Sequence, residues 1–320
     1  MRKTLLGASA LVSVAMLASS AAQAAASYIT VAPPAGAVSI TVFGINDNNI
    51  VAGSYTDSAG TQHGYYGPPD GSNYKTFDLS GVTGTQPRAI FNDKSITGLA
   101  LADGFTFGEE FYRSPTGDIT VMKKKGVLLD GVAQGGNDTG LYVGDYLDPT
   151  GVRVGYTAIA GKIQSSVKLR NLTVTSTNPR QINNLGVIAG SYIDSVGIQH
   201  GFVLNGRKAK SFDFPGAVGV TAGEGINDAG LVSGLWTDSA GNRHGFLYDS
   251  INRNFKQIGP DNGSTFQEAW GLNQKGLVAG DTSNGDGWIY CPLKPRRCPA
   301  GQAAAAVHPL RALKGPVNIP

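Results

Sequence analysis

Residues 44–67 read GINDNNIVAGSYTDSAGTQHGYYG, and residues 225–248 read GINDAGLVSGLWTDSAGNRHGFLY. The two stretches share an Asn, a glycine seven residues later, an Asp-x-x-Gly turn and a His-Gly-aromatic triplet. Related copies occur six times along the chain. Their anchor residues are Asn46, Asn92, Asn137, Asn183, Asn227 and Asn273. Successive anchors are 44 to 46 residues apart, so we interpret the chain as one structural unit repeated six times.

Each unit has the composition of short strands joined by tight turns. Asn-Asp-x-Gly and Asp-x-x-Gly are turn sequences, because Asx side chains bond to nearby backbone and glycine supplies positive φ. Residues 50–55 and 244–248 are rich in β-formers and have the length of a strand. A third run, as in residues 210–214, and a fourth strand leading into the next anchor complete the unit. Four strands in about 46 residues are typical of one propeller blade.

We therefore expect an all-β fold, a six-bladed β-propeller of four-stranded blades. Residues 28–37 resemble the third run of a unit, whereas only two clear strands, near 277–281 and 287–291, follow the last anchor. The N-terminal strand is expected to complete the last blade and to close the ring. Such closure protects sheet edges and removes the need for capping repeats.

The repeats resemble a known family. The turn beginning at Gly44, the following run Val51-Ala52-Gly53-Ser54-Tyr55 and the triplet His63-Gly64-Tyr65 are similar to the extracellular repeats of the bacterial HAF family. The similarity extends from about Tyr28 to Cys291. The triplet here is His-Gly-aromatic rather than His-Ala-Phe, and the second, third and sixth copies lack the His. The resemblance implies export and a repeat fold, and no particular activity.

The N-terminus has the pattern of an export signal. Arg2 and Lys3 precede an uncharged apolar stretch over residues 5–18, and Ala22-Gln23-Ala24 fits a signal peptidase site, with cleavage after Ala24 or Ala26. We therefore predict a signal peptide over 1–26, the propeller over 27–298 and a disordered tail over 299–320. A secreted protein, extracellular or periplasmic, is expected, and no later segment has the ~20 apolar residues of a membrane span.

The net charge bears on nucleic-acid binding, and the cysteine content bears on disulfide formation. The net charge of +3 falls to +1 without Arg2 and Lys3, and five further cations follow Cys291, so no basic stripe for nucleic acid is expected in the body. Cys291 and Cys298 are the two cysteines, and they are expected to pair in an oxidising compartment. We expect a monomer.

Positions that vary between the units at the ring's centre are the candidates for ligand binding. In most propellers the strand that enters each blade lines the channel. Here that strand, just before each anchor, carries Phe43, Arg88, Gln134, Arg180, Glu224, Glu268 and Trp270. We predict a ligand site formed by Arg88, Arg180, Glu224, Glu268 and Trp270, since Arg forms bidentate bonds and Trp stacks. Ordinary salt bridges lining the channel are the alternative.

The repeated histidines and aspartates have a simpler interpretation. His63, His200 and His244 occupy one slot in different units, and we expect a local hydrogen bond to the neighbouring turn rather than a metal site. Each Asp-x-x-Gly turn holds one carboxylate, which favours an Asx turn over a calcium site. We expect no metal and no cofactor.

Three functions remain open. The preferred one is a secreted, non-catalytic propeller that binds a small ligand, glycan or protein partner at one face. The second is an extracellular glycan hydrolase or lyase that uses Glu224 or Glu268 with Arg88 or Arg180 at the channel, although the chain has no nucleophile elbow, His-Glu-x-x-His or phosphate loop. The third is a structural envelope component without a ligand.

Overall fold

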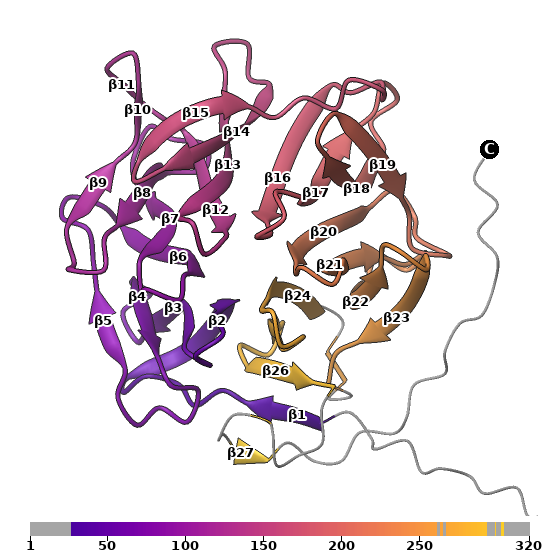
Figure 1. The fold of residues 1–320 in the computed structure, drawn as a ribbon. Coiled ribbons are helices and arrows are strands. Elements are labelled where there is room, and N and C mark those ends of the chain that lie inside the picture. Colours follow the sequence, from indigo (N-terminus) through magenta and orange to yellow (C-terminus); the bar gives the residue numbers. More distant parts are fainter. Residues whose placement is uncertain (1–26, 261–262, 265–266, 293–297, 299–301, 304–320) are drawn as a thin grey trace, which may run out of the picture.

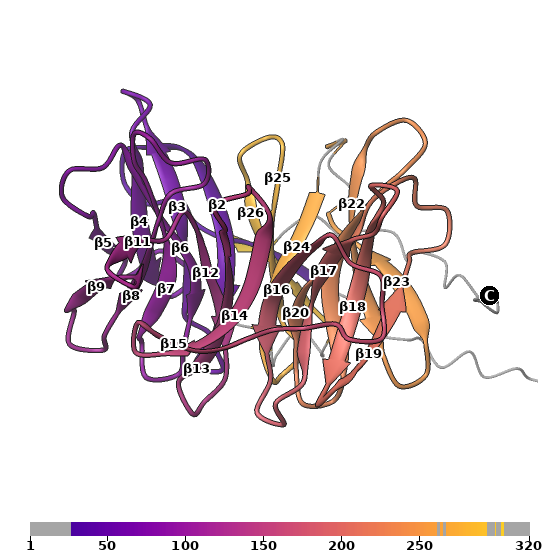
Figure 2. The same ribbon diagram turned by 90° about the horizontal axis from the view of Figure 1, so that it is seen from above.

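The computed structural model describes residues 27–260, 263–264, 267–292, 298 and 302–303. Every regular element in this part of the chain is a β-strand, so it contains no helix that could cross a membrane. Antiparallel sheets are arranged around a central axis, with β2, β6, β12, β16, β20 and β24 innermost (Figure 1). Figure 2 shows the same sheets from above, side by side. The fold is an all-β propeller.

Three consecutive sheets have four strands each, hydrogen-bonded in chain order. The first contains β12 (Gly131–Gly136), β13 (Leu141–Leu147), β14 (Arg153–Ile159) and β15 (Lys162–Ser166). The second contains β16 (Ser176–Ile182), β17 (Ile188–Ile193), β18 (Gln199–Asn205) and β19 (Lys208–Phe212). The third contains β20 (Thr221–Ile226), β21 (Leu231–Thr237), β22 (Arg243–Asp249) and β23 (Asn254–Ile258).

The first two repeats form strands that are connected into one larger sheet. One part contains β2 (Ala37–Ile45), β3 (Val51–Asp57), β4 (Gln62–Gly67) and β5 (Lys75–Phe77). The other contains β6 (Gly84–Ile90), β7 (Ile96–Leu101), β8 (Glu109–Arg113) and β9 (Ile119–Val121). A single parallel pair, Gln62 with Gly84, joins β4 to β6. A separate hairpin, β10 (Lys123–Lys124) with β11 (Val127–Leu128), follows.

The last sheet combines both ends of the chain. Its strands are β24 (Gln267–Leu272), β25 (Val278–Thr282), β26 (Gly287–Cys291), β1 (Ser27–Thr30) and β27 (Gln302–Ala303). The expected pairing of the N-terminal strand is confirmed, since β1 runs antiparallel to β26 from Ser27↔Cys291 to Thr30↔Trp288. The expected Cys291–Cys298 disulfide is present.

The expected domain limits are only partly within the described residues. The expected signal peptide over 1–26 lies outside them. Two residues of the segment expected to be a disordered tail form β27 against β1, and the other residues of that segment are outside the described part of the chain.

A cross-strand pair explains two of the repeated positions. The glycine after each anchor lies directly opposite the aromatic residue of the next strand, and each of these aromatic rings is at most 2% exposed. The six pairs are Gly53↔Tyr65, Gly98↔Phe111, Gly144↔Tyr156, Gly190↔Phe202, Gly234↔Phe246 and Gly280↔Trp288. A Cβ at Gly234 would lie 2.4 Å from the Phe246 ring and 2.1 Å from the Ala222 carbonyl oxygen. Only glycine leaves room for the ring between the sheets.

The anchor asparagines do more than shape turns. Asn183 Oδ1 accepts hydrogen bonds from the amides of Leu185 and Val187, which is the Asx turn expected from the sequence. Its Nδ2 donates to the carbonyl of Asn227, the anchor of the next sheet, at 2.9 Å. Five of the six anchors donate to a backbone carbonyl of the following repeat in this way. Among these five, Asn273 is the last in the chain and donates back to the Asn46 carbonyl of the first repeat at 3.0 Å. Asn92 instead donates to two aspartates of the neighbouring repeats.

Glu110 marks the largest departure from the repeat. In the other five repeats the residue before the buried aromatic is glycine, whereas here a fully buried carboxyl group occupies that position. Space for it comes from the next sheet, where a Cβ on Gly131 would lie 2.6 Å from Glu110 Oε1. The Tyr156 hydroxyl donates to the other oxygen. Burial raises the pKa of Glu110 well above its usual range.

We predict that Asn183→Ala lowers the free energy of unfolding by about 2–4 kcal/mol, because buried backbone groups in two sheets lose their partner. Asn183→Asp retains the turn acceptor but not the donor, and should also be destabilised. Urea unfolding measures both variants. The control is Asn254→Ala, at an exposed residue of β23, and it is expected to unfold within about 0.5 kcal/mol of the parent. An Asn183→Asp protein as stable as the parent would show that the link between sheets contributes nothing.

We predict that Glu110→Gln becomes more stable relative to the parent as the pH rises. A raised pKa means that the stabilising contribution is present below the unfolded-state pKa and is lost as pH rises toward the folded-state value. Gln keeps an acceptor for Tyr156 and does not ionise. Unfolding at pH 5 and pH 9 tests this, with Glu110→Ala expected to be less stable than the parent at both. An unchanged difference between parent and Glu110→Gln across this range contradicts it.

Candidate functional site

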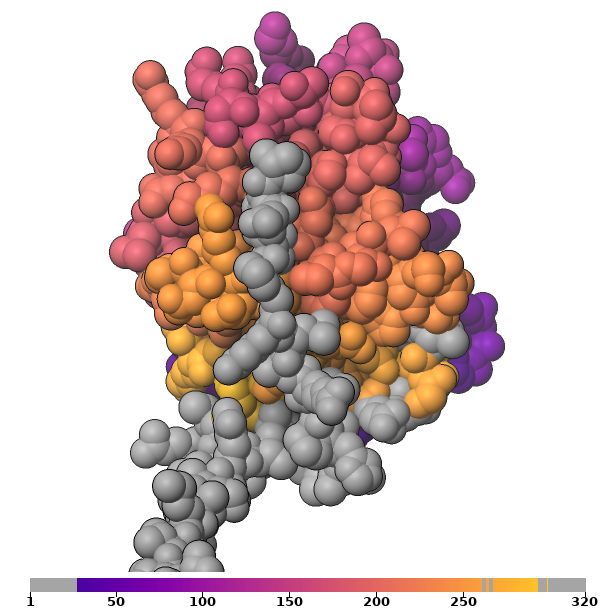
Figure 3. All heavy atoms as spheres, turned by 90° about the vertical axis from the view of Figure 1, so that its right-hand side faces the viewer, coloured from indigo at the N-terminus to yellow at the C-terminus, as the bar shows by residue number. Residues whose placement is uncertain are grey.

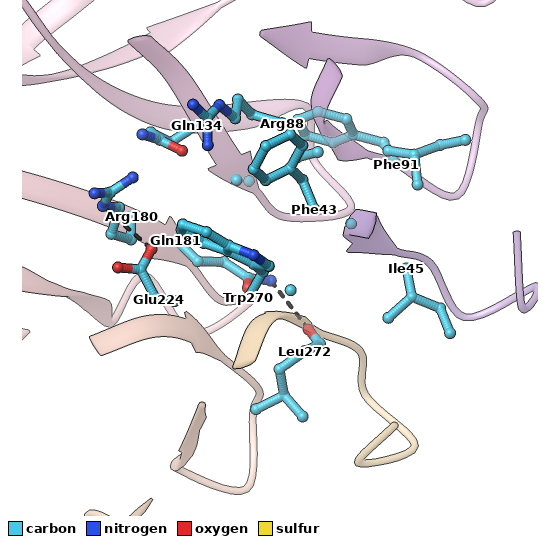
Figure 4. A pocket seen from close by; sticks show the side chains of 16 residues that line it. Phe43, Ile45, Arg88, Phe91, Gln134, Arg180, Gln181, Glu224, Trp270 and Leu272 are labelled. Carbon is cyan, nitrogen blue, oxygen red and sulfur yellow. Dashed lines mark hydrogen bonds and ion pairs between the residues drawn. The ribbon is translucent and has the colours of Figure 1, made fainter. Parts of the chain in front are cut away.

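The innermost strands surround a small cavity on the propeller axis. Its volume is about 50 Å³, and its lining includes, from each inner strand, one side chain named in the sequence analysis (Figure 4). These side chains are Phe43, Arg88, Gln134, Arg180, Glu224 and Trp270. The expectation that the strand before each anchor lines the channel is therefore confirmed for six of the seven residues named from the sequence. The cavity has room for a few waters or one small polar group.

Arg88 packs against the aromatic side of the cavity. Its guanidinium carbon lies 4.0 Å from the ring centroid of Phe43 and 5.8 Å from that of Trp270. The two rings meet edge to face, with centroids 5.2 Å apart. One terminal nitrogen of Arg88 donates to Gln86 at 2.9 Å, whereas Nε is buried and has no hydrogen-bond partner. Cation–π contacts thus orient Arg88 and leave one donor free.

The opposite wall contains a buried ion pair. Arg180 Nε lies 3.2 Å from Glu224 Oε2, and Glu224 is 7% exposed. Glu224 Oε1 is buried without a partner, as is Nε2 of Gln134, which is 5% exposed. Counting Arg88 Nε, two donors and one acceptor around this cavity lack protein partners. Buried polar atoms are rarely left unpaired, so these three are unusual in lacking a protein partner.

A chain of polar contacts supports Arg180. Arg153 forms an ion pair with the fully buried Asp145. In the amide orientation that satisfies both of its atoms, Asn178 donates to Asp145 at 2.7 Å and accepts from Arg180 at 3.1 Å. The contacts therefore continue from Arg153 through Arg180 to Glu224. Such a network holds the arginine side chains in one geometry.

Burial alters the charge states around the axis. Desolvation is the main cause that lowers the pKa of Arg88 to about 10, and the neighbouring Arg180 adds to it. Desolvation likewise raises the pKa of Glu224 to about 7, although Arg180 opposes the shift. Glu268 and Asp281 are raised to about 7 for the same reason. The cavity is therefore most positive below pH 7, where Glu224 is neutral.

The structure corrects the position of Glu268. Glu268 does not line the cavity; it is 1% exposed and forms an ion pair with Arg243. It lies two residues before Trp270 on β24, so the sequence spacing alone did not distinguish the residue that lines the cavity from the one that does not. The Trp270 indole instead donates to Asp281, a buried carboxylate on the adjacent strand that the sequence analysis missed.

Gln181 is a second residue of the site that the sequence analysis did not identify. Its amide donates to the Leu272 carbonyl at 3.3 Å and accepts from the Ile226 amide at 3.2 Å, so it joins three inner strands (Figure 4). The sequence signal that could have indicated it is its position beside Arg180, two residues before the anchor Asn183. Gln181 lines the axial cavity and also the adjoining hollow beside the anchor asparagines, which we call the mouth of the axial cavity.

The mouth beside the anchors is surrounded by alternating carboxylates and amides. Asn184 Nδ2 donates to Asp138 at 2.9 Å and to Asp228 at 3.1 Å, and Gln274 bonds to both neighbouring repeats. The six residues in order are Asp47, Asn92, Asp138, Asn184, Asp228 and Gln274. These carboxylates are engaged by amides. Within the described residues, no group of three or more His, Cys, Asp or Glu side chains is arranged to hold a metal ion.

The repeated histidines bond to their local turns, as expected. His63 contacts Asp57 at 3.3 Å and Asp78 at 2.8 Å, and its ring stacks on Tyr55. The other two make the same contact with the turn aspartate, His200 with Asp194 and His244 with Asp238. Asp57 also accepts two backbone amides, the Asx turn predicted for it.

The comparisons with known proteins agree on the fold. No model of a known family matches the chain, and no curated protein matches it. Among solved structures it is similar to TolB from Acinetobacter baumannii, with 15% identity over 79% of this chain and a TM-score of 0.52; the chain spans 64% of that protein. It is similar at 12% identity to the assigned TolB of Agrobacterium tumefaciens, over 84% of this chain and 97% of that one, with a TM-score of 0.52. At these identities the likeness shows the propeller fold alone.

We predict that Glu224→Gln reduces the pH dependence of stability. The pKa of Glu224 is raised to about 7 in the folded protein, so its stabilising contribution is present below the unfolded-state pKa of about 4.3 and is lost as pH rises through 7. Unfolding free energies at pH 4.5, 6 and 8 should fall less steeply in the variant. An identical slope in parent and variant contradicts the assignment, whatever the variant's absolute stability.

Proposed function

We propose that this chain is an exported, non-catalytic propeller of six blades that binds a compact anionic group of its ligand in the axial cavity. The observation that carries the proposal is the meeting of Arg88, Arg180 and Gln134 in one cavity, with a donor of Arg88 and a donor of Gln134 left without partners. Arginine forms its strongest hydrogen bonds with carboxylates and phosphates.

The size of the cavity limits what enters it. Pockets for whole small molecules measure about 300–1,000 Å³, whereas this one is about 50 Å³. A single carboxylate fits, while the body of the ligand remains at the mouth. A sugar acid and an acidic peptide side chain share this chemistry, and both are consistent with a glycan or protein partner.

The count of six blades is supported by the regularity of the repeat. The glycine–aromatic pair occurs six times, and the anchor links run from repeat to repeat and return to the first. One residue pair joins β4 to β6, so we assign the strands on either side of it to two blades.

Export and family membership are proposals supported by fewer observations. The disulfide between Cys291 and Cys298 is compatible with a secreted or periplasmic protein. The Asn turn, the glycine and the aromatic that resemble HAF repeats are the positions that link and pack the sheets. We propose a HAF-like exported repeat protein that acts as a monomer.

The alternative of a glycan-active enzyme receives less support. Glycoside hydrolysis ordinarily uses two carboxyl groups flanking the bond that is cleaved. Of the two candidates, Glu224 is paired with Arg180, and Glu268 is paired with Arg243 away from the cavity. One carboxyl group therefore lines the cavity where the reaction needs two.

The test is titration calorimetry of the mature protein with galacturonate, acetate and neutral galactose. We expect galacturonate and acetate to bind and galactose not to bind. Affinity should be higher at pH 6 than at pH 8, because Glu224 gains a negative charge as pH rises through about 7. Arg88→Gln should weaken binding about tenfold or more, since it removes a charged donor.

Two further variants make the result specific. Gln134→Met removes a donor with little change in size, and should weaken binding while the protein remains folded. Arg170→Gln changes an exposed arginine outside the axis and should leave binding unchanged. Equal affinity for galactose, or full affinity in folded Arg88→Gln protein, contradicts the proposal.

A further inference from the structure

A much larger cavity lies between two neighbouring sheets, away from the axis. Its volume is about 660 Å³, within the range of small-molecule pockets and more than ten times that of the axial cavity. The turn between β16 and β17, together with β18 and β19, forms one side, and β22 with the adjoining turns forms the other. In Figure 3, residues of these two sheets, in salmon and orange, lie next to one another on the face toward the viewer.

The floor of this cavity is aromatic. Phe212 of β19 and Tyr248 of β22 come from different sheets, and their ring centroids lie 4.5 Å apart. Val203 and Val187 line the same space. An apolar floor of this kind binds the hydrocarbon part of a ligand.

Two strongly exposed apolar side chains stand at the rim. Leu185 is 70% exposed and Ile251 is 74% exposed, and both line the cavity. The slot of Leu185, two residues after the anchor, holds Asn, Lys, Thr, Ala and Lys in the other repeats. Since the other five repeats fold without leucine there, the blade does not require Leu185, and an apolar ligand accounts for it.

Lys208 and Lys210 provide the positive charge. They alternate on β19 with Phe212, so all three project from the same face of the strand toward the cavity. Both lysines are exposed, and within the described residues neither has an ion-pair partner. Asp228 also lines the cavity, but its carboxylate accepts two bonds from Asn184.

The lysine equivalent to Lys210 in the next groove around the ring has a hydrogen-bond partner. Lys256 pairs with Leu247 as Lys210 pairs with Val203, so the two lysines are equivalent. Lys256 donates at 2.7 Å to the hydroxyl of Tyr290, a residue of the next sheet. Lys210 makes no such bond to Tyr248, the residue equivalent to Tyr290. In the cavity between the β16–β19 and β20–β23 sheets, Lys208 and Lys210 are therefore available to bind an anion.

We propose that the cavity between the β16–β19 and β20–β23 sheets binds an amphipathic anion, with its apolar chain or ring on Phe212 and Tyr248 and its acidic head on Lys208 and Lys210. The concave shape and single-ligand volume favour a small molecule over a protein segment. This site does not depend on the function proposed for the axial cavity.

The experiment is titration calorimetry of the mature protein with decanoate and with uncharged decanamide at pH 7.5. We expect decanoate to bind at least tenfold more tightly than decanamide. The double change Lys208→Glu with Lys210→Glu should weaken decanoate binding at least tenfold, and Leu185→Asp should weaken both ligands. All three side chains are exposed, so the variants should fold as the parent does.

The chain offers matched controls. Lys162 opens β15 as Lys208 opens β19, in the same slot of the preceding repeat but outside the cavity, so Lys162→Glu should leave binding unchanged. Arg88→Gln removes the carboxylate binding proposed for the axis, so decanoate binding that persists in this variant is assigned to the cavity between the sheets. Absence of decanoate binding, equal binding of decanamide, or an equal loss in Lys162→Glu overturns the proposal.

Discussion

The hydrogen bond from five of the six anchor asparagines to the backbone of the next sheet is the constraint on which the ring depends. Asn183 Oδ1 fixes its own turn, while Nδ2 reaches the backbone of Asn227 in the following repeat. One side chain therefore couples the geometry of a turn to the position of the neighbouring sheet. Because Asn273 donates back to Asn46, the series of links returns to its start and gives both ends of the array a partner.

The packing between sheets follows from a second constraint at the glycine–aromatic pairs. A buried ring such as Phe246 lies over Gly234, where any side chain would collide with it. Where the repeat departs from its pattern, the neighbouring sheet compensates. Glu110 replaces a glycine, and Gly131 opposite supplies the space that the carboxyl group needs.

Positions that these constraints leave free differ from repeat to repeat, and both proposed sites lie there. On the axis, Arg88 and Arg180 stand at one slot that holds other residue types elsewhere in the ring. Between two sheets, Leu185 and Lys208 line a cavity, whereas in the next groove the lysine equivalent to Lys210 is bonded to Tyr290. A repeated scaffold thus carries unrepeated side chains, and those are the ones available for ligands.

The sequence by itself determined the strands, the turns, the N-terminal strand's place beside β26 and six of the channel residues, because local turn chemistry and a fixed period are written into each repeat. Only the tertiary structure decided that Glu268 turns away to Arg243, that Asn178 connects Asp145 with Arg180, and that one groove stays open. These outcomes depend on distances between residues of different sheets. Repeat spacing along the chain carries no information about such distances, since equivalent positions in two repeats can face different neighbours.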